Sequence, residues 1–365
     1  MLANLGAETV KHIFSWDLRS DTRYALKLFR LQDGSCARAW ENADLESEAH
    51  DTILHRLGEA RYRQWFVFDA VTPAIEIDRA CAARIEGLCP GIGQALEWPP
   101  CMHKDSMSED GEDGEDGDMD MDVREDMDPN SFMGAAILFV DGGVTLDEYY
   151  MQLKATRQDA MVLFILEPLF EALVAMREAG LMHNDIKPEN IMVDRVTGAP
   201  RFIDVALGHP HIVKEYLAEP SRYILWPLDY FHAAGYSNAA PSTMTDGYDD
   251  QARDAGLGRT LSASFAAKFP SRDRLWCNPE FLSGIDGFMM GKLLETISSD
   301  VTPLKTRAGS ALCAEVAKLG SAMCEYNVRD RMDVTTAAAV YKDICARARA
   351  RKDFTYFECS RTMLK

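Results

Sequence analysis

The stretch GLMHNDIKPENIMVD, from Gly180 to Asp194, constrains the fold of this chain more than any other part of the sequence. Its eight residues from His183 to Asn190 include a histidine, two acids, a lysine and a proline, with apolar residues on both sides. Pro188 argues against a buried helix, and the apolar flanks argue against a solvated loop. The pattern predicts a polar loop fixed between two core elements, which is how a rigid scaffold presents a catalytic loop.

Hydrophobic periodicity predicts a chain that begins with strands and ends with helices. We expect helical structure over 159–180, kinked or started at Pro168 and closed by Gly180, and mainly helical structure from about 282 onward. The other expected elements are strands at 23–30, 135–143 and 200–207 and a helix at 44–57. This order favours two lobes over an alternating parallel sheet.

Residues about 98–131 form a segment of low complexity that carries most of the net charge of −19. Between Asp105 and Asp128 there are 13 Asp or Glu residues and one Arg. Such a segment repels itself and buries little apolar area, so we predict a disordered insertion. A calcium loop is disfavoured because Val123 and Pro129 stand where a Gly and a Glu are needed. A solvated spacer and a docking segment for a basic partner remain as alternatives.

The cysteine and hydropathy patterns indicate the cell compartment and the classes of partner to expect. Nine cysteines are scattered singly with no C-x-x-C pair, which argues for reduced thiols and against a zinc site. No run approaches the ~20 apolar residues of a membrane span, and the first residues do not form a secretory signal. We therefore expect a cytoplasmic or nuclear location, with neither a membrane nor a nucleic acid as partner.

Five motifs in order along the chain resemble those of the eukaryotic-type protein kinase superfamily. HNDIKPEN, from His183 to Asn190, resembles the catalytic loop H-R-D-L-x-x-x-N. The other four are YALK at 24–27 for V-A-I-K, FIDVA at 202–206 for D-F-G, DGFMMGKLLE at 286–295 and RDRMDVTTAAAVYK at 329–342, the last with Arg331 in place of a late arginine. The resemblance covers about residues 5–345 apart from the acidic segment.

This resemblance implies an α+β fold, the bilobal protein-kinase fold, with a small β-rich N-lobe and a larger, mainly helical C-lobe. The N-lobe is expected at 1–143, including the disordered acidic insertion, and the C-lobe at 144–350. A C-terminal tail is expected at 351–365. The implied activity is transfer of the γ-phosphoryl of MgATP to a serine or threonine hydroxyl of a protein substrate.

The resemblance also assigns roles to residues, with ATP and Mg²⁺ as the implied cofactors. Asp185 would accept or orient the proton of the substrate hydroxyl, and Lys187 would neutralise the transferring phosphate. Asn190 and Asp204 would supply oxygen ligands to the metal, and Lys27 would reach the α- and β-phosphates. The remaining ATP-binding residues by position are Gly6, Ile13, Ala25, Met192 and the hinge Phe139, Val140 and Asp141.

Several positions depart from the kinase pattern. Only the first glycine of the phosphate loop, Gly6, is present, and His50 falls where an acid that pairs with Lys27 is usual. Glu46 and Glu48 are the alternatives for that acid. Asn184 replaces the arginine that grips a phosphorylated activation loop, which implies activity without loop phosphorylation. Val205 stands in place of phenylalanine in D-F-G.

These departures leave two alternatives to an active serine/threonine kinase. A pseudokinase would use the same fold as a binding or scaffolding module. A kinase-like enzyme would instead phosphorylate a small molecule.

Overall fold

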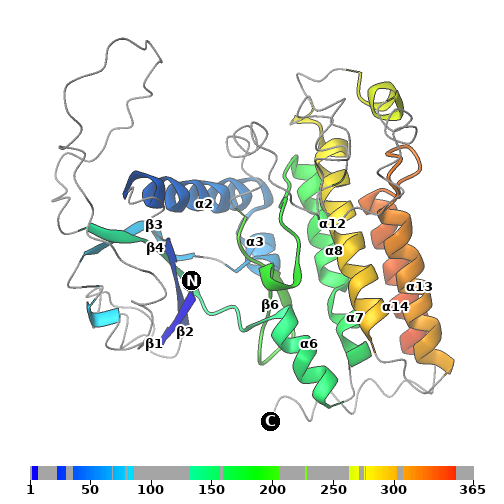
Figure 1. Cartoon of the computed structure of the whole chain (residues 1–365), viewed down its shortest axis with the longest axis horizontal. Coiled ribbons are helices and arrows are strands. Elements are labelled where there is room, and N and C mark those ends of the chain that lie inside the picture. The colour runs from blue at the N-terminus through cyan, green and yellow to red at the C-terminus, as the bar shows by residue number, and fades with distance from the viewer. Residues whose placement is uncertain are drawn as a thin grey trace, which may run out of the picture. The chain divides into compact units, whose positions relative to one another are not determined.

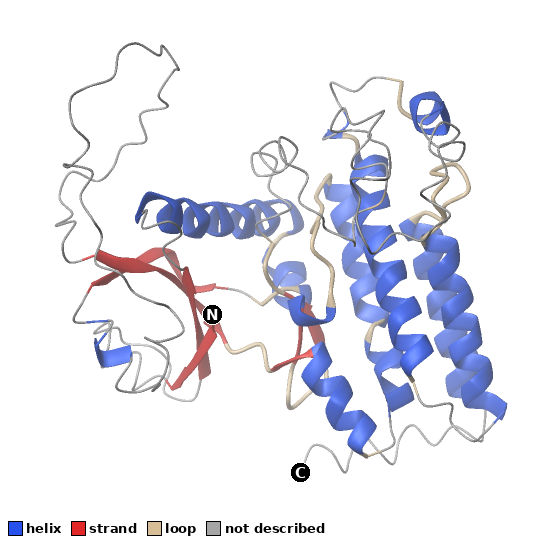
Figure 2. Cartoon of the chain, viewed as in Figure 1, coloured by secondary structure: helices blue, strands red, loops and turns tan. Residues whose placement is uncertain are grey.

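The computed structural model describes residues 2–6, 23–29, 36–67, 69–78, 81, 83–85, 132–156, 159–205, 227, 263–270, 275, 277–301 and 307–350. The chain divides into two compact units (Figure 1). The first unit comprises residues 1–48 and 68–141, and the second comprises 49–67 and 142–365. Small antiparallel sheets and many helices make the fold α+β (Figure 2). The acidic segment and the tail 351–365 lie outside the described residues.

A four-stranded antiparallel sheet in the order β1-β2-β4-β3 forms the centre of the first unit. Its strands are β1 (Leu2–Gly6), β2 (Arg23–Phe29), β3 (Asp69–Asp78) and β4 (Phe132–Val140). Ala135, Ala136 and Leu138 are completely buried on the central strand β4. The strands expected at 23–30 and 135–143 are confirmed as β2 and β4.

The helix α2 (Cys36–Leu57) begins in the first unit and continues into the second. The expected helix at 44–57 is confirmed, with an additional N-terminal part. A short helix, α3 (Glu59–Trp65), follows after Gly58.

The second unit contains a small three-stranded sheet in the order β5-β6-β7. Its strands are β5 (Val144–Thr145), β6 (Ile191–Val193) and β7 (Pro200–Phe202), and the 3-10 turn η3 (Pro188–Asn190) leads directly into β6. All three residues of β6 are buried. The apolar residues after the HNDIKPEN loop therefore form the central strand of this sheet.

Helices make up most of the remaining described residues of the second unit, and α8, α12, α13 and α14 lie side by side in Figure 1. The helices are α6 (Leu146–Ala155), α7 (Val162–Ile165), α8 (Glu167–Ala179), α12 (Pro279–Asp300), α13 (Arg307–Met323) and α14 (Val334–Ala350), with a 3-10 turn η2 at Asp159–Met161. The predicted start and end of α8 are confirmed, because Pro168 stands in its first turn and Gly180 ends it with φ 65°.

The helix α12 is buried on almost every side, which explains why it lacks an amphipathic pattern. A Cβ on Gly291 would lie 2.8 Å from the Cβ of Met323 and 2.9 Å from the carbonyl oxygen of Gly320, so this glycine allows close packing of α12 on α13. Arg331, just before α14, donates to the carbonyl oxygen of Glu325 at 2.8 Å and lies over the Phe288 ring. Arg331, from the motif at 329–342, therefore contacts the helix that carries the motif at 286–295.

The two units differ from the expected lobes mainly in residues 49–67, which belong to the second unit. The reason is the packing of α3 and the residue after it. The Val67 amide donates to the carbonyl oxygen of Phe202 at 3.0 Å, and the Tyr62 ring stacks on Phe66, which in turn contacts Phe202. The helix α3, which follows an N-terminal strand in sequence, therefore packs on the sheet of the second unit.

None of the helices in the described ranges is both long and apolar enough to cross a membrane.

Candidate functional site

The loop from His183 to Asn190 is held by one carboxylate of the central helix α12. Asp286 accepts hydrogen bonds from the backbone amides of His183 and Asn184, each at 2.8 Å, through its two different oxygens. Asp286 is buried, and burial raises its pKa to about 7, although both amide hydrogen bonds act to lower it. A buried carboxylate is costly, so its position under this loop indicates that the loop must be held accurately.

Within the loop, the side chains of Lys187 and Asn190 converge on Asp185. Lys187 Nζ lies 2.8 Å and Asn190 Nδ2 lies 2.6 Å from the same oxygen, Oδ2 of Asp185. Asp185 is only 4% exposed, whereas Lys187 is partly exposed. The structure therefore brings the two residues predicted as catalytic, Asp185 and Lys187, together with the predicted metal ligand Asn190.

The orientation of the Asn190 amide follows from its neighbours. Its Nδ2 also donates to the carbonyl oxygen of Asp185, at 3.0 Å. Both nearby atoms are acceptors, so the NH₂ end must face Asp185 and the Oδ1 atom must point elsewhere. A carboxamide oxygen held in this way is suited to a hard cation such as Mg²⁺, which binds through one or two side-chain oxygens and keeps several waters.

Asp204, the second predicted metal ligand, follows β7. Its neighbour Ile203 forms hydrogen bonds with the loop from His183 to Asn190. The Ile203 amide donates to the Asn190 carbonyl oxygen, and the Ile203 carbonyl oxygen lies 3.0 Å from His183 Nε2. The pairing of β6 with β7 thus fixes Asp204 relative to Asn190. These two oxygen-bearing residues fit Mg²⁺. No group of three or more His, Cys, Asp and Glu suited to a metal occurs among the residues described above.

His183 is a structural residue of this site. It is completely buried, and this burial lowers its pKa. The nearby carboxylates of Asp185 and Asp204 act to raise the pKa, but the effect of burial is larger. One neutral tautomer satisfies both ring nitrogens, because Nε2–H donates to Ile203 while Nδ1 accepts from the Asp185 amide at 3.3 Å. The histidine therefore links Asp185 to the residue before Asp204.

Two residues of the site, Asn184 and Asp204, have left-handed backbone conformations, with φ of 64° and 61°. They are the only non-glycine residues with positive φ in the described part of the chain. Such conformations are uncommon for residues with a Cβ, although Asn and Asp tolerate them best. Their placement beside Asp185 and at a predicted metal ligand agrees with the tendency of backbone strain to gather at functional sites.

In the first unit, Lys27 of β2 forms an ion pair with Glu46 of α2. The Glu46 side chain is 1% exposed and that of Lys27 is 19% exposed. Of the two acids that the sequence left open, Glu46 is thus shown to contact Lys27. The pair lies one helical turn before His50, where the acid was expected.

The other predicted ATP-binding residues of the first unit lie on neighbouring strands. Ala25 of β2 pairs with Phe139 of β4, and Tyr24 pairs with Val140. Ala25 and Lys27 point to the same face of β2, because side chains alternate along a strand. Gly6 ends β1, opposite Arg23, and Asp141 is the last residue of this unit. Ile13 lies outside the described residues.

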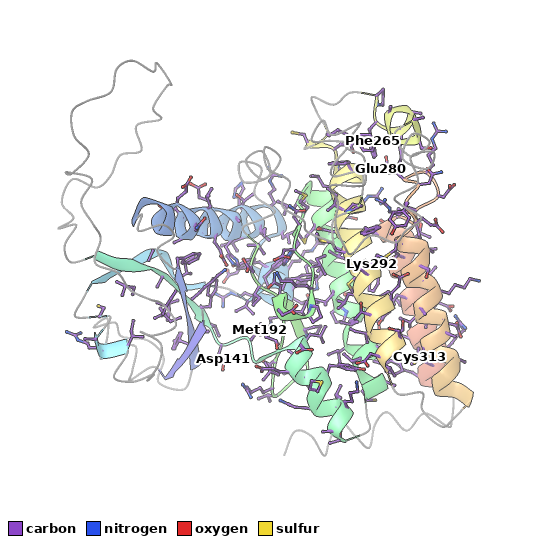
Figure 3. The ribbon with its side chains drawn as sticks, viewed as in Figure 1. Asp141, Met192, Phe265, Glu280, Lys292 and Cys313 are labelled. Atoms are coloured by element: carbon purple, nitrogen blue, oxygen red, sulfur yellow. The ribbon has the colours of Figure 1, made fainter. Side chains whose placement is uncertain are left out.

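Met192, the predicted floor of the adenine site, lies buried on β6 in the second unit (Figure 3). A Cβ on Gly142 would come 3.0 Å from the Cβ of Met192, and one on Gly143 would come 2.0 Å from the Val193 carbonyl oxygen. Gly143 also has φ 110°, so both space and backbone conformation require glycine there. Neither glycine was predicted to be a residue of the site.

Met289 was missed altogether. Its sulfur accepts a hydrogen bond from the Ile186 amide in the loop from His183 to Asn190. The sequence contained no signal for this role, because buried methionines usually serve only as core residues.

No family model matches this sequence, and no curated protein matches it significantly.

Proposed function

We propose that this chain is a protein kinase that transfers the γ-phosphoryl of MgATP to a serine or threonine hydroxyl of a protein. The observation that carries the proposal is the buried Asp185, contacted by Lys187 and Asn190 in a loop that Asp286 holds from α12. Support also comes from the ion pair between Lys27 and Glu46. We further propose that the α+β fold is of the bilobal protein-kinase type.

In this proposal, the Asp185 carboxylate accepts the proton, or the hydrogen bond, of the substrate hydroxyl. Asn190 restricts the orientation of that carboxylate through its two hydrogen bonds. Lys187 provides a positive charge 2.8 Å from the Asp185 carboxylate and would stabilise negative charge on the transferring group. Most of the catalytic effect would come from positioning and charge neutralisation, because phosphoryl transfer needs little covalent help from the protein.

Three side chains would bind the nucleotide or its metal. Asn190 Oδ1 and the Asp204 carboxylate would bind Mg²⁺, and Lys27 would bind the α- and β-phosphates. Bound Mg²⁺ neutralises charge on the phosphates and so makes the γ-phosphoryl more susceptible to attack. Glu46 keeps the Lys27 ammonium in a fixed position.

A pseudokinase is the alternative with a specific observation in its favour. Gly6 is the only glycine between residues 1 and 33, where the kinase pattern has three in its phosphate loop. Fewer glycines restrict how closely a backbone can approach phosphates. Such a protein would bind partners through this fold and transfer no phosphoryl group.

The proposal is tested by melting the protein with ATP in the presence and absence of Mg²⁺, and by assaying phosphoryl transfer from labelled ATP. Acceptors should include peptides bearing serine, threonine or tyrosine and small hydroxylated metabolites. We expect Mg²⁺-dependent stabilisation by ATP and labelling of serine or threonine. Lys27→Met should abolish both, whereas Lys154→Met, which removes an exposed lysine paired with Asp300, should abolish neither.

The outcomes separate the three functions. Labelling of metabolites alone would identify a small-molecule kinase. ATP binding without any transfer would identify a pseudokinase, and absence of both binding and transfer would refute the nucleotide site itself.

A further inference from the structure

The amide of Ile186 has an unusual acceptor. Ile186 stands between Asp185 and Lys187 and is 1% exposed. Its amide nitrogen lies 3.4 Å from the sulfur of Met289, a completely buried residue of α12. Within the described residues this thioether is the only acceptor of the Ile186 amide. A buried amide needs a partner, so the sulfur fills a requirement that no oxygen meets here.

Met289 and Asp286 act on the same loop from the same helix. Residues three apart on a helix face the same side, so Met289 follows Asp286 along the surface that faces the loop. Both oxygens of Asp286 already accept from the amides of His183 and Asn184. Met289 thereby extends the support from α12 past Asp185, and the backbone is held on both sides of that residue.

We propose that Met289 is a positioning residue that fixes Asp185 for phosphoryl transfer by accepting a hydrogen bond from the Ile186 amide. This inference rests on the proposed function, because Asp185 must be the residue that meets the substrate hydroxyl. Sulfur is a weak and polarisable acceptor, so it holds the amide at a longer distance than an oxygen would. The position of the Asp185 backbone therefore depends on the length and strength of the hydrogen bond between the Ile186 amide and the Met289 sulfur.

The experiment compares two adjacent methionines of α12. Met289 and Met290 are both completely buried, and only Met289 accepts a hydrogen bond among the contacts of the described residues. Leucine is close to methionine in volume, so both Met289→Leu and Met290→Leu should fold. A third variant, Met289→Gln, keeps an unbranched side chain and supplies an oxygen acceptor while burying an additional polar group.

We expect Met289→Leu to lower kcat about five- to tenfold with KM for MgATP unchanged, since no nucleotide ligand is altered. Hydrogen exchange of the Ile186 amide should become at least about tenfold faster, since its acceptor is removed. Met290→Leu should change neither quantity. Met289→Gln should retain more of the wild-type kcat than Met289→Leu, although it should melt at a lower temperature because of its buried polar group.

If Met289 served only in packing, Met289→Leu should retain more of the wild-type kcat than Met289→Gln, and it should also be the more stable of the two. That order would overturn the proposal, as would equal losses of kcat in Met289→Leu and Met290→Leu. Unchanged exchange of the Ile186 amide in Met289→Leu would also overturn it. In each case a wild-type protein that still transfers phosphoryl groups leaves the proposed function standing, whereas an inactive wild type overturns both.

Discussion

Two polar loops flank the short strand β6, and they are held in opposite ways. The loop before it, His183–Asn190, depends on Asp286 and Met289, about a hundred residues away in sequence. The turn after it begins at Asp194, whose Oδ1 accepts from the amides of Val196 and Thr197 at 2.9 and 2.7 Å. The turn therefore satisfies its polar groups locally, whereas the loop needs another helix to do so.

This difference distinguishes a structural aspartate from the aspartate that we propose to act in catalysis. Asp194 is partly exposed and contributes to a turn that could form in many proteins. Asp185 is buried, and a residue with a left-handed backbone precedes it. Long-range support of a strained loop is the arrangement expected where geometry matters more than local stability.

Removing Asp286 is expected to have the largest effect on stability. Asp286→Ala leaves two buried loop amides without acceptors, so the unfolding free energy should fall by about 3–5 kcal/mol. Phosphoryl transfer should be lost as well, because the loop is no longer held. Urea unfolding measures the first effect and the transfer assay the second.

The control for Asp286→Ala is Asp300→Ala, which removes an exposed aspartate of the same helix that pairs with Lys154. This control should cost less than about 1 kcal/mol. Equal losses for the two variants would show that α12 does not support the loop through Asp286.

The ion pair of the first unit provides the second prediction. Lys27→Met leaves the Glu46 carboxylate buried without its cation, and the unfolding free energy should fall by about 2–3 kcal/mol. Glu46→Gln should cost less, because the partly exposed Lys27 can still reach water. Glu48→Gln, at an exposed position of the same helix, should change stability little. If Glu48→Gln were as damaging as Glu46→Gln, the assignment of the pair would be wrong.

The third prediction concerns pH. The pKa of Asp286 is raised by burial from 3.8 to about 7, so the folded state binds an additional proton between these values. Its contribution to stability is therefore fully present below pH 3.8 and is lost as pH rises through about 7. Between these values the unfolding free energy should fall by at most about 1.4 kcal/mol per pH unit because of this group.

His183 gives a slope of opposite sign, because burial lowers its pKa. The informative quantity is therefore the difference between the wild type and Asp286→Asn, measured by urea unfolding across this pH window. As pH rises, the unfolding free energy of the wild type should decrease relative to that of Asp286→Asn. A difference that does not vary with pH would contradict the raised pKa.

The smallest effect is expected at the local turn. Burial acts to raise the pKa of Asp194, but hydrogen bonds from Thr197 and Val196 and the charge of Arg201 outweigh it and lower the pKa. Asp194→Asn should cost about 1 kcal/mol, and this cost should shrink as pH falls below 3.8, where the carboxylate becomes protonated. A loss as large as that of Asp286→Ala would remove the distinction between the two loops.

The same contrast explains what could be predicted from the sequence. The ends of α8 were predictable because Pro168 and Gly180 act locally, and β2 and β4 were predictable from their apolar residues. The convergence of Asp185, Lys187 and Asn190 was also within reach, because these residues lie within six positions of one another.

Contacts between distant segments were not predictable in the same way. Counting along α2 placed the expected acid at His50, yet Glu46 is the residue that reaches Lys27, because the register of a helix on a sheet is set by packing. The placement of 49–67 with the second unit depends on stacking of Tyr62 and Phe66 near Phe202, which no local pattern reveals. Met289 gave no signal because a methionine in a buried helix normally indicates only packing.

The most direct test of the central claim compares Asp185→Asn with Asp194→Asn in one phosphoryl-transfer assay. Each variant replaces one carboxylate by an amide of nearly the same shape, Asp185 in the loop before β6 and Asp194 in the turn after it. We predict that Asp185→Asn lowers turnover by about a hundredfold or more while MgATP still raises the melting temperature, and that Asp194→Asn keeps wild-type turnover. Full activity in Asp185→Asn would contradict the account.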